Sequence, residues 1–198
     1  MTTYALNGLG RIGKLALRPL LERGAQIAFI NDAIGDPAMH AHLLEFDSVH
    51  GRWPAEFAAD ADAISIDGTR IPVTSTRTLE DLPLDGVDVV IDCTGAFKTE
   101  ASLAPYFAAG VKMVIVSAPV KDGPTANIVY GVNEGIYDPA THQIITAASC
   151  TTNCLAPVVK VLLEGIGIKH GSITTIHDVT NTQTIIDRPA KDLRRARS

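Results

Sequence analysis

The sequence predicts an α/β fold in which a doubly wound parallel sheet is followed by the beginning of an α+β domain. Short apolar runs rich in valine and isoleucine alternate with amphipathic, helix-like segments. This alternation is typical of parallel strands joined by right-handed crossovers. The pattern changes after residue 149, so we expect one domain over residues 1–149 and the start of a second over residues 150–198.

Apolar runs bounded by glycine, aspartate or proline are interpreted as buried strands, at residues 4–8, 26–32, 87–95, 111–119 and 127–133. Helical patterns lie between some of these runs, at residues 11–24 and 99–110.

Three other segments are interpreted individually. In residues 99–110, Thr99 is a plausible N-cap, and Pro105 lies beyond the first turn, so a bend or a late helix start is expected there. Residues 60–75 alternate around Asp67 and Gly68, which predicts an inserted hairpin. After Cys150 we expect a helix and then a strand over residues 171–180.

Composition excludes several classes of protein. The chain has 198 residues, of which 46% are hydrophobic, so it can form a core and is not expected to be disordered. Its net charge is -5 and no basic run exceeds two residues, which argues against nucleic-acid and membrane-surface partners. No apolar run approaches the roughly 20 residues needed to span a bilayer, and the first ten residues do not look like a signal peptide. Three cysteines without framework spacing indicate free thiols in a reducing, cytoplasmic setting.

The first strand leads into a glycine-rich turn, Gly8-x-Gly10-x-x-Gly13, which opens the first helix. In a Rossmann-type fold such glycines let the backbone approach a pyrophosphate, which the helix N-terminus binds. Asp32, at the end of the second strand, would accept hydrogen bonds from the adenosine ribose. Its charge would repel a 2'-phosphate, which favours NAD over NADP. The simpler alternative is a strand-turn-helix with glycines that only pack.

Cys93 opens the small-residue stretch 93–97 after another predicted strand. Small residues at such strand ends let a ligand lie close to the backbone. We interpret Cys93 itself as a small apolar filler and not as a reactive group.

Four interpretations of Cys150 and Cys154 are open: a metal pair, a disulfide, two buried thiols, or a nucleophile with a second, unreactive cysteine nearby. A metal pair lacks ligands, because His142 and His177 show no zinc-type spacing with the cysteines. A disulfide between helix positions four apart has poor geometry. Cys154 is followed by apolar residues and is expected to be a buried small hydrophobe.

Cys150 lies where a strand-like run ends and a helix begins, with Ser149 or Thr151 near the cap. A thiol there feels the helix dipole and becomes more acidic. His177 is the candidate base on the predicted strand. A cysteine, a histidine and a dinucleotide fold together suit aldehyde oxidation by a nucleophile beside a nicotinamide.

Nine segments follow one another along the chain: "NGLGRIG", "IND", "EFDSVHGRW", "DCTG", "SAPVKD", "YGVNE", "AASCTTNCLAP", "TTIHDVTNTQT" and "KDLRRAR". In these segments and their order, essentially the whole chain resembles phosphorylating glyceraldehyde-3-phosphate dehydrogenase. This resemblance implies a homotetramer that uses NAD, glyceraldehyde 3-phosphate and inorganic phosphate to make 1,3-bisphosphoglycerate through a thioester.

The resemblance also assigns roles to residues. Cys150 would be the nucleophile and His177 the base. Besides the three glycines, the cofactor would be contacted by Arg11, Ile12, Asp32, Arg77, Thr94, Gly95 and Ser117. Phosphate groups would be bound by Ser149, Thr151 and Thr180.

The chain departs from the family in three ways. It stops in a segment that in the family reaches the neighbouring subunit's cofactor, so we expect a truncated chain that is not by itself a competent tetramer. Thr182 replaces an acidic residue, and Arg188 stands beside the neighbouring ribose, which leaves NADP open as a second cofactor. The sequence around His42 and His177 is also similar to that of a branch of the family associated with arsenate-detoxification operons, in which arsenate would replace phosphate.

Two alternatives remain at this point. One is a non-catalytic nucleotide-binding or interaction module. The other is a related enzyme that acts on erythrose 4-phosphate, whose sequence around the histidine differs from that of this chain.

Overall fold

A computed structural model describes residues 1–180, 183, 185–186, 189 and 192–197. The chain forms two compact units, Met1–Val161 and Leu162–Ser198. They divide inside a long helix, so the expected domain boundary after residue 149 stays a prediction.

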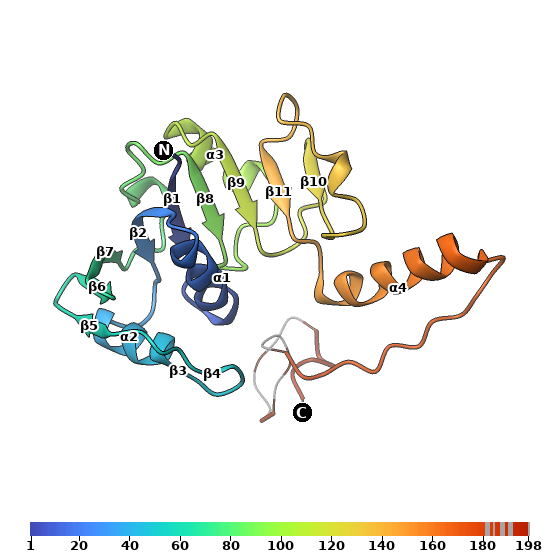
Figure 1. Ribbon diagram of the computed structural model, residues 1–198, viewed down its shortest axis with the longest axis horizontal. Coiled ribbons are helices and arrows are strands. Elements are labelled where there is room, and N and C mark those ends of the chain that lie inside the picture. The colour runs from blue at the N-terminus through green and yellow to red at the C-terminus, as the bar shows by residue number, and fades with distance from the viewer. Residues whose placement is uncertain (181–182, 184, 187–188, 190–191, 198) are drawn as a thin grey trace. The chain divides into compact units, whose positions relative to one another are not determined.

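The first unit is built on strands β1 (Thr3–Asn7), β2 (Gln26–Asn31), β5 (Phe57–Ala59), β6 (Ala63–Ile66), β7 (Thr69–Thr74), β8 (Val89–Asp92), β9 (Met113–Val116), β10 (Thr125–Asn127) and β11 (Ile144–Thr146). In the described part of the chain they form a nine-stranded sheet in the order β10-β11-β9-β8-β1-β2-β7-β6-β5 (Figure 1). Pairing is parallel from β10 to β7 and antiparallel from β7 to β5. The predicted largely parallel α/β sheet is therefore confirmed. A separate ladder joins β3 (Phe46–Asp47) to β4 (Gly51–Arg52).

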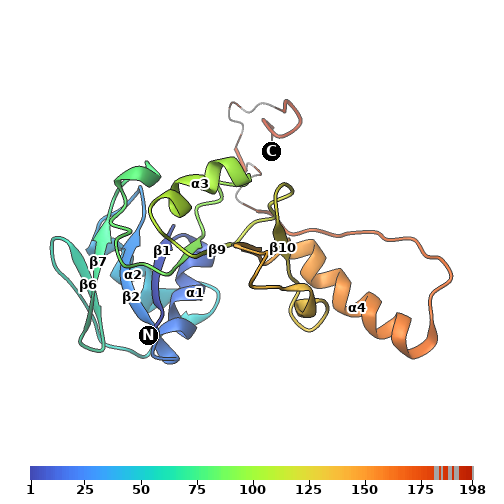
Figure 2. The same cartoon turned by 90° about the horizontal axis from the view of Figure 1, so that it is seen from above.

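The described helices are α1 (Arg11–Glu22), α2 (Pro37–Glu45), α3 (Glu100–Ala108) and α4 (Cys150–Ile166), with short 3-10 turns at Leu79–Asp81 and Glu134–Ile136. Helices α1 and α3 cover opposite faces of the sheet (Figure 2). Consecutive strand residues point to opposite faces. Leu6 accordingly belongs to the core cluster that includes Leu17 of α1, and Ala5 to the cluster that includes Leu103 of α3.

The inserted hairpin is confirmed. Strands β6 and β7 pair antiparallel around Asp67 and Gly68, with φ angles of 48° and 78°. Two successive positive φ values are what a type I' hairpin turn requires, and an Asp-Gly pair tolerates them.

Helix α3 begins earlier than the late start expected from Pro105. Its N-cap, Thr99, forms a capping box with Ser102, in which each side chain accepts a hydrogen bond from the other's backbone N–H. Such caps stabilise a helix start by about 1 kcal/mol. The helix therefore starts at Glu100 and continues through Pro105, and the expected late start is wrong.

The strand expected over residues 127–133 is wrong in its position along the chain. Strand β10 ends at Asn127, and the chain turns from Val129 onward. The side chain of Asn133 accepts from the N–H of Val129 at 2.7 Å and donates to the carbonyl of Asn127 at 3.0 Å. An asparagine that bonds backbone in this way competes with a strand ladder.

Helix α2 was missed, although it carries a start signal. Asp36 is its N-cap and accepts from the N–H of Met39, and Pro37 is the first helical residue. An aspartate followed by proline is a favourable pair for these two positions.

The strand expected over residues 171–180 is also wrong. This segment has no regular secondary structure, and its residues are exposed. No described segment pairs with it, and an isolated strand is not stable in water because its backbone groups lack partners.

Candidate dinucleotide and nucleophile sites

The centre of the sheet has a topological switch point between β1 and β8. The chain leaves β1 through α1 to reach β2 on one side, and β8 pairs with β1 on the other. Ligands of doubly wound sheets bind in the crevice outside the carboxyl ends of strands at such a point. Here these ends carry Gly8, Asp32 and the stretch from Cys93 to Gly95.

The three motif glycines have different reasons to be glycine. At Gly8 the φ angle is +94°, and a Cβ would lie 2.6 Å from the backbone nitrogen of Thr94. At Gly13 a Cβ would lie 1.9 Å from the carbonyl oxygen of Gly8. At Gly10 a Cβ would meet no atom within 4 Å. Gly8 and Gly13 therefore allow the strand, the turn and the helix to pack, whereas Gly10 leaves open space at the start of α1.

The N-terminus of α1 suits an anion. Gly10 is its N-cap and supplies no side-chain hydrogen bond, and the first turn has no acidic residue. Arg11 and Ile12 are exposed there. The first N–H groups of a helix lack intrahelical partners, and the helix dipole makes this end positive. The residues present thus fit the pyrophosphate of a dinucleotide.

The side chain of Arg11 is directed elsewhere. Its guanidinium pairs with Asp47 at 2.5 Å and contacts the Nδ1 atom of His50 at 2.9 Å. The hydrogen bond from Arg11 holds the pKa of Asp47 well below its usual range. The contact expected between Arg11 and a pyrophosphate would therefore come from the backbone N–H.

Asp32 joins the second strand end to the glycine-rich turn. Its carboxylate accepts from the N–H of Leu9 at 2.7 Å and from that of Ile34 at 3.0 Å. Two carboxylate oxygens offer about four acceptor positions, so two hydrogen bonds leave capacity for ribose hydroxyls. The two backbone hydrogen bonds fix the orientation in which the Asp32 carboxylate would face the ribose hydroxyls.

The remaining cofactor candidates follow the neighbouring strands at the same edge. Arg77 is exposed in the loop after β7, Thr94 and Gly95 are exposed after β8, and Ser117 is half-buried after β9. Both the N–H and the hydroxyl of Thr94 donate to Asp92, at 3.0 and 2.7 Å. One edge of the sheet thus carries all ten cofactor candidates, while their individual roles stay predictions.

Cys93 behaves as a structural thiol. It packs against the core cluster on the α1 side of the sheet. Burial raises its pKa to about 11, so the thiol is protonated at neutral pH. The interpretation of Cys93 as a small filler agrees with this environment.

Cys150 is the first residue of α4 and is exposed. Ser149 caps this helix: its hydroxyl accepts from the N–H of Thr152 at 3.1 Å, and its carbonyl accepts from the N–H of Asn153 at 2.9 Å. The structure therefore places the Cys150 thiol at a capped helix N-terminus, where general principle favours the thiolate. Thr151 is exposed in the same turn.

Sequence reasoning missed the residue that shapes the approach to α4. The amide of Asn153 donates to the carbonyl of Ala147 at 2.7 Å and to that of Ser149 at 2.9 Å. Between them Ala148 has a φ of 56°, and its N–H donates to the hydroxyl of Thr146. A left-handed residue other than glycine is strained by about 1 kcal/mol or more, and Asn153 and Thr146 hold it. An asparagine one turn into a helix was the available signal.

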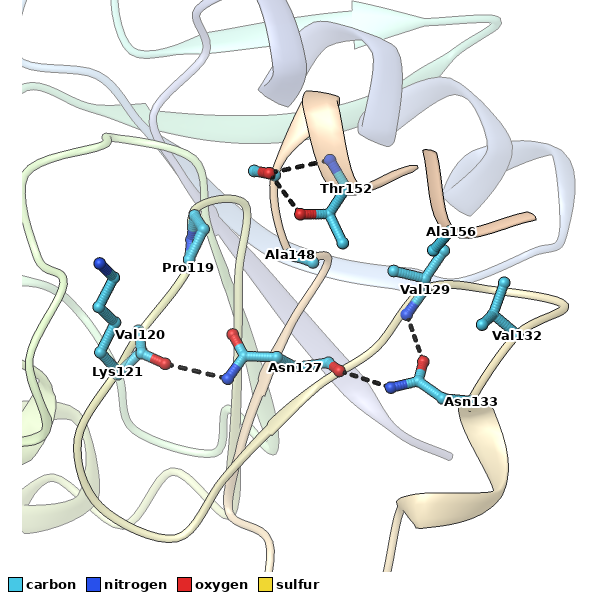
Figure 3. Close-up of a pocket in the computed structure, with 11 residues that line it drawn as sticks. Pro119, Val120, Lys121, Asn127, Val129, Val132, Asn133, Ala148, Thr152 and Ala156 are labelled. Carbon is cyan, nitrogen blue, oxygen red and sulfur yellow. Dashed lines mark hydrogen bonds between the residues drawn. The ribbon is translucent and has the colours of Figure 1, made fainter. Parts of the chain in front are cut away.

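A cavity of about 370 Å³ lies beside this turn (Figure 3). It opens between the loop after β9 and the first turn of α4, and Asn127 is hydrogen-bonded to the carbonyl of Val120 in its wall. Ser149 and Thr152 line it, whereas Cys150 does not. The cavity is mostly apolar.

The expectation that Cys154 is buried is wrong. Its side chain is exposed, as are Val158 and Val161 further along α4. The described residues of the same unit leave this face of the helix exposed.

His177 and Thr180 belong to the second unit, and both are exposed. The Nδ1 atom of His177 lies 2.6 Å from the carbonyl of Asp178, and the N–H of Thr180 donates to the side chain of Gln183. Because Cys150 lies in the first unit, the pairing of Cys150 with His177 stays a prediction. Thr182 and Arg188, which bear on the phosphate site and on NADP, lie outside the described residues.

Over the described part of the chain, no group of three or more histidine, cysteine, aspartate or glutamate side chains could hold a metal ion. The helices described there are all too short or too polar to cross a membrane.

Comparison with known proteins agrees with the fold and the motifs. Residues 2–100 match the family model described as glyceraldehyde 3-phosphate dehydrogenase, NAD binding domain, and residues 149–198 match that of its C-terminal domain. A Nostoc protein named glyceraldehyde-3-phosphate dehydrogenase 3 is 54% identical over 98% of this chain, and a glyceraldehyde-3-phosphate dehydrogenase of Streptomyces coelicolor is 50% identical over 98%. The chain spans 58% of the length of each of these relatives. It belongs to the glyceraldehyde-3-phosphate dehydrogenase family, and it comprises that family's NAD-binding domain followed by the start of its C-terminal domain.

Proposed function

We propose that the chain serves the NAD-dependent, phosphorylating oxidation of glyceraldehyde 3-phosphate to 1,3-bisphosphoglycerate, with Cys150 as the nucleophile. The observation that carries this proposal is the exposed Cys150 at the capped N-terminus of α4, in the same compact unit as the open N-terminus of α1. One terminus favours a thiolate and the other an anionic dinucleotide.

In the proposed reaction the Cys150 thiolate adds to the aldehyde carbon, and the alkoxide that forms takes a proton from the imidazolium of His177 to give a hemithioacetal. His177 accepts the proton from its hydroxyl as the carbon loses hydride, which leaves a thioester on Cys150. Bound NAD supplies the hydride acceptor. Inorganic phosphate then attacks the acyl carbon, and the Cys150 thiolate leaves with the electrons of the broken carbon–sulfur bond.

Hydroxyl side chains beside Cys150 suit phosphate binding. Ser149 and Thr151 are its neighbours in the chain, and by resemblance Thr180 is the third proposed ligand. The Ser149 hydroxyl already accepts from the N–H of Thr152, so its own proton is available to donate either to the hydroxyl of Thr152 or to a phosphate oxygen.

We infer a preference for NAD over NADP from Asp32, whose carboxylate is held at the end of β2 by two backbone N–H groups. A 2'-phosphate would meet this fixed negative charge. Steady-state kinetics with both cofactors test the inference, and a clear preference for NADP would refute it.

The test of the reaction is formation of NADH or NADPH from glyceraldehyde 3-phosphate, with phosphate and arsenate in parallel. In an assembled enzyme that contains this chain, turnover with NAD that Cys150→Ser abolishes and Cys154→Ser retains is the expected result. Turnover that survives Cys150→Ser would contradict the proposed mechanism. The phosphate and arsenate arms show which oxyanion the site uses.

Alkylation by iodoacetamide separates the enzyme from a non-catalytic binding module. A competent site makes Cys150 react much faster than Cys154, although both are exposed, and His177→Asn slows it. Equal rates at the two cysteines would favour the binding module.

The assembly and the setting are inferred by resemblance. We infer a homotetramer, which sedimentation analysis tests, and a cytoplasmic setting, which agrees with three free cysteines.

A further inference from the structure

A row of buried polar residues crosses the carboxyl edge of the sheet. Strand register places Asn7 of β1 beside Asn31 of β2 and beside Asp92 of β8. All three are at most 3% exposed. Each lies two positions after a member of the core cluster on the α3 side, so all three face α3. Buried amides and carboxylates are costly unless they are hydrogen-bonded, so this row needs partners.

Tyr106 of α3, itself fully buried, supplies the central partner. Its hydroxyl donates to Oδ2 of Asp92 at 2.8 Å and accepts from the amide nitrogen of Asn7 at 2.6 Å. The amide oxygen of Asn7 accepts from the nitrogen of Asn31 at 2.8 Å. The amide oxygen of Asn31 accepts from the N–H of Thr76 at 2.9 Å.

These hydrogen bonds have one direction. An ionised carboxylate only accepts, so Tyr106 must donate to Asp92 and can only accept from Asn7. Asn7 must then turn its nitrogen to Tyr106 and its oxygen to Asn31. Asn31 in turn presents its oxygen to the N–H of Thr76. Asp92 at one end and the backbone of Thr76 at the other thus require the same orientation of the two amides, and Tyr106 joins the two ends.

The two ends of the row are loops of the candidate dinucleotide site. Asp92 holds Thr94 by its N–H and its hydroxyl, next to Gly95. Asn31 holds both the N–H and the carbonyl of Thr76, next to Arg77. These loops follow β8 and β7, which lie on either side of the β1–β2 pair.

We infer that Tyr106 is a positioning residue for the dinucleotide site, because its hydroxyl links the loop of Thr94 and Gly95 to the loop of Thr76 and Arg77. It acts through Asp92, Asn7 and Asn31 and needs no contact with the ligand. The hydrogen-bonded link between the two loops is a property of the fold alone, whereas its effect on NAD binding rests on the proposed function.

Asp92→Asn tests the direction of the row at almost constant shape. The oxygen of the new amide must face the donors of Thr94, so its nitrogen faces Tyr106. The Tyr106 hydroxyl then loses its acceptor at residue 92 and can donate only if Asn7 turns its oxygen toward it. That turn sets the nitrogen of Asn7 against the nitrogen of Asn31, whose orientation Thr76 fixes, so Asn31 loses its partner on β1. Amide hydrogen exchange at Thr76 should therefore accelerate by about tenfold, the loss expected for one buried hydrogen bond. Exchange at Ile64 of β6 is the reference for global destabilisation. Acceleration at Thr94 alone would overturn the inference.

Tyr106→Phe removes the link at its centre, and Tyr130→Phe is the matched control, because Tyr130 is 89% exposed. NAD titrated into the unmodified chain and into both variants should bind about tenfold more weakly to Tyr106→Phe only. If the unmodified chain binds NAD and Tyr106→Phe binds it equally well, the inference fails and the proposed function stands. If the unmodified chain does not bind NAD, the proposed function fails, and exchange at Thr76 still decides the link.

Discussion

The carboxyl edge of the sheet and the outer part of α4 differ in how far their side chains are buried and bonded within the chain. At the sheet edge, Asn7, Asn31 and Asp92 are buried and bonded to one another or to Tyr106. Along α4, Val158, Val161 and Leu163 are exposed. The comparison teaches that the side chains of the dinucleotide half of the site are bonded within the chain, whereas α4 presents the nucleophile from a helix whose outer part leaves apolar side chains exposed.

The largest expected effect would come from closing the contact between α1 and the turn before it. Gly13→Ala places a Cβ 1.9 Å from the carbonyl oxygen of Gly8, so the helix must move away from the strand. We expect a loss of about 3 kcal/mol or more in the free energy of unfolding, as for severe overpacking, measured by urea denaturation.

Gly10→Ala is the matched control for Gly13→Ala, because a Cβ at Gly10 meets no atom within 4 Å. Stability should fall by no more than about 1 kcal/mol, the usual cost of alanine at an N-cap, while NAD binding weakens because the Cβ enters the space left for the pyrophosphate. Equal destabilisation by the two variants would show that the packing argument is wrong.

A smaller effect is expected at the start of α4. Ser149→Ala removes the hydroxyl that accepts from the N–H of Thr152 and should lower stability by about 1 kcal/mol. It should also slow alkylation of Cys150 by more than that of Cys154, because Cys150 is the first residue of the helix. If Cys150 kept its rate, the cap would not be what positions the thiol.

The smallest expected effect is a dependence of the folding stability on pH. Burial raises the pKa of Asp92 above its ordinary value of 3.8, so the folded state holds this proton more tightly than the unfolded state. Stability contributed by protonated Asp92 is present below pH 3.8 and is lost as the pH rises through the raised pKa. Asp92→Asn removes this loss, so its stability relative to the unmodified chain should improve as the pH rises. Denaturation curves of both chains across that range check the sign, and a constant difference would contradict it.

Local signals made much of the fold predictable. The glycine-rich turn, the Asp67–Gly68 hairpin and the strands expected at residues 4–8, 26–32, 87–95 and 111–119 depend on neighbours in the sequence, and a turn or strand is found at each of these places. The turn after Asn127 was missed because "NIVYGVN" looks like a strand, while the side chain of Asn133 bonds its backbone into a turn.

Other features depend on residues far away in the sequence. Tyr106 contacts Asn7, 99 positions earlier, and no local pattern announces that pair. The expected strand over residues 171–180 has no partner in the described chain, so its propensity is not realised.

NAD titrated calorimetrically into the 198-residue chain, with NADP in a parallel titration, tests most directly whether the dinucleotide half, whose side chains are bonded within the chain, binds its ligand. We predict saturable binding of one NAD per chain, weaker binding of NADP because of Asp32, and loss of this difference in Asp32→Ala. Absence of NAD binding by a folded chain, or tighter binding of NADP, would contradict the account.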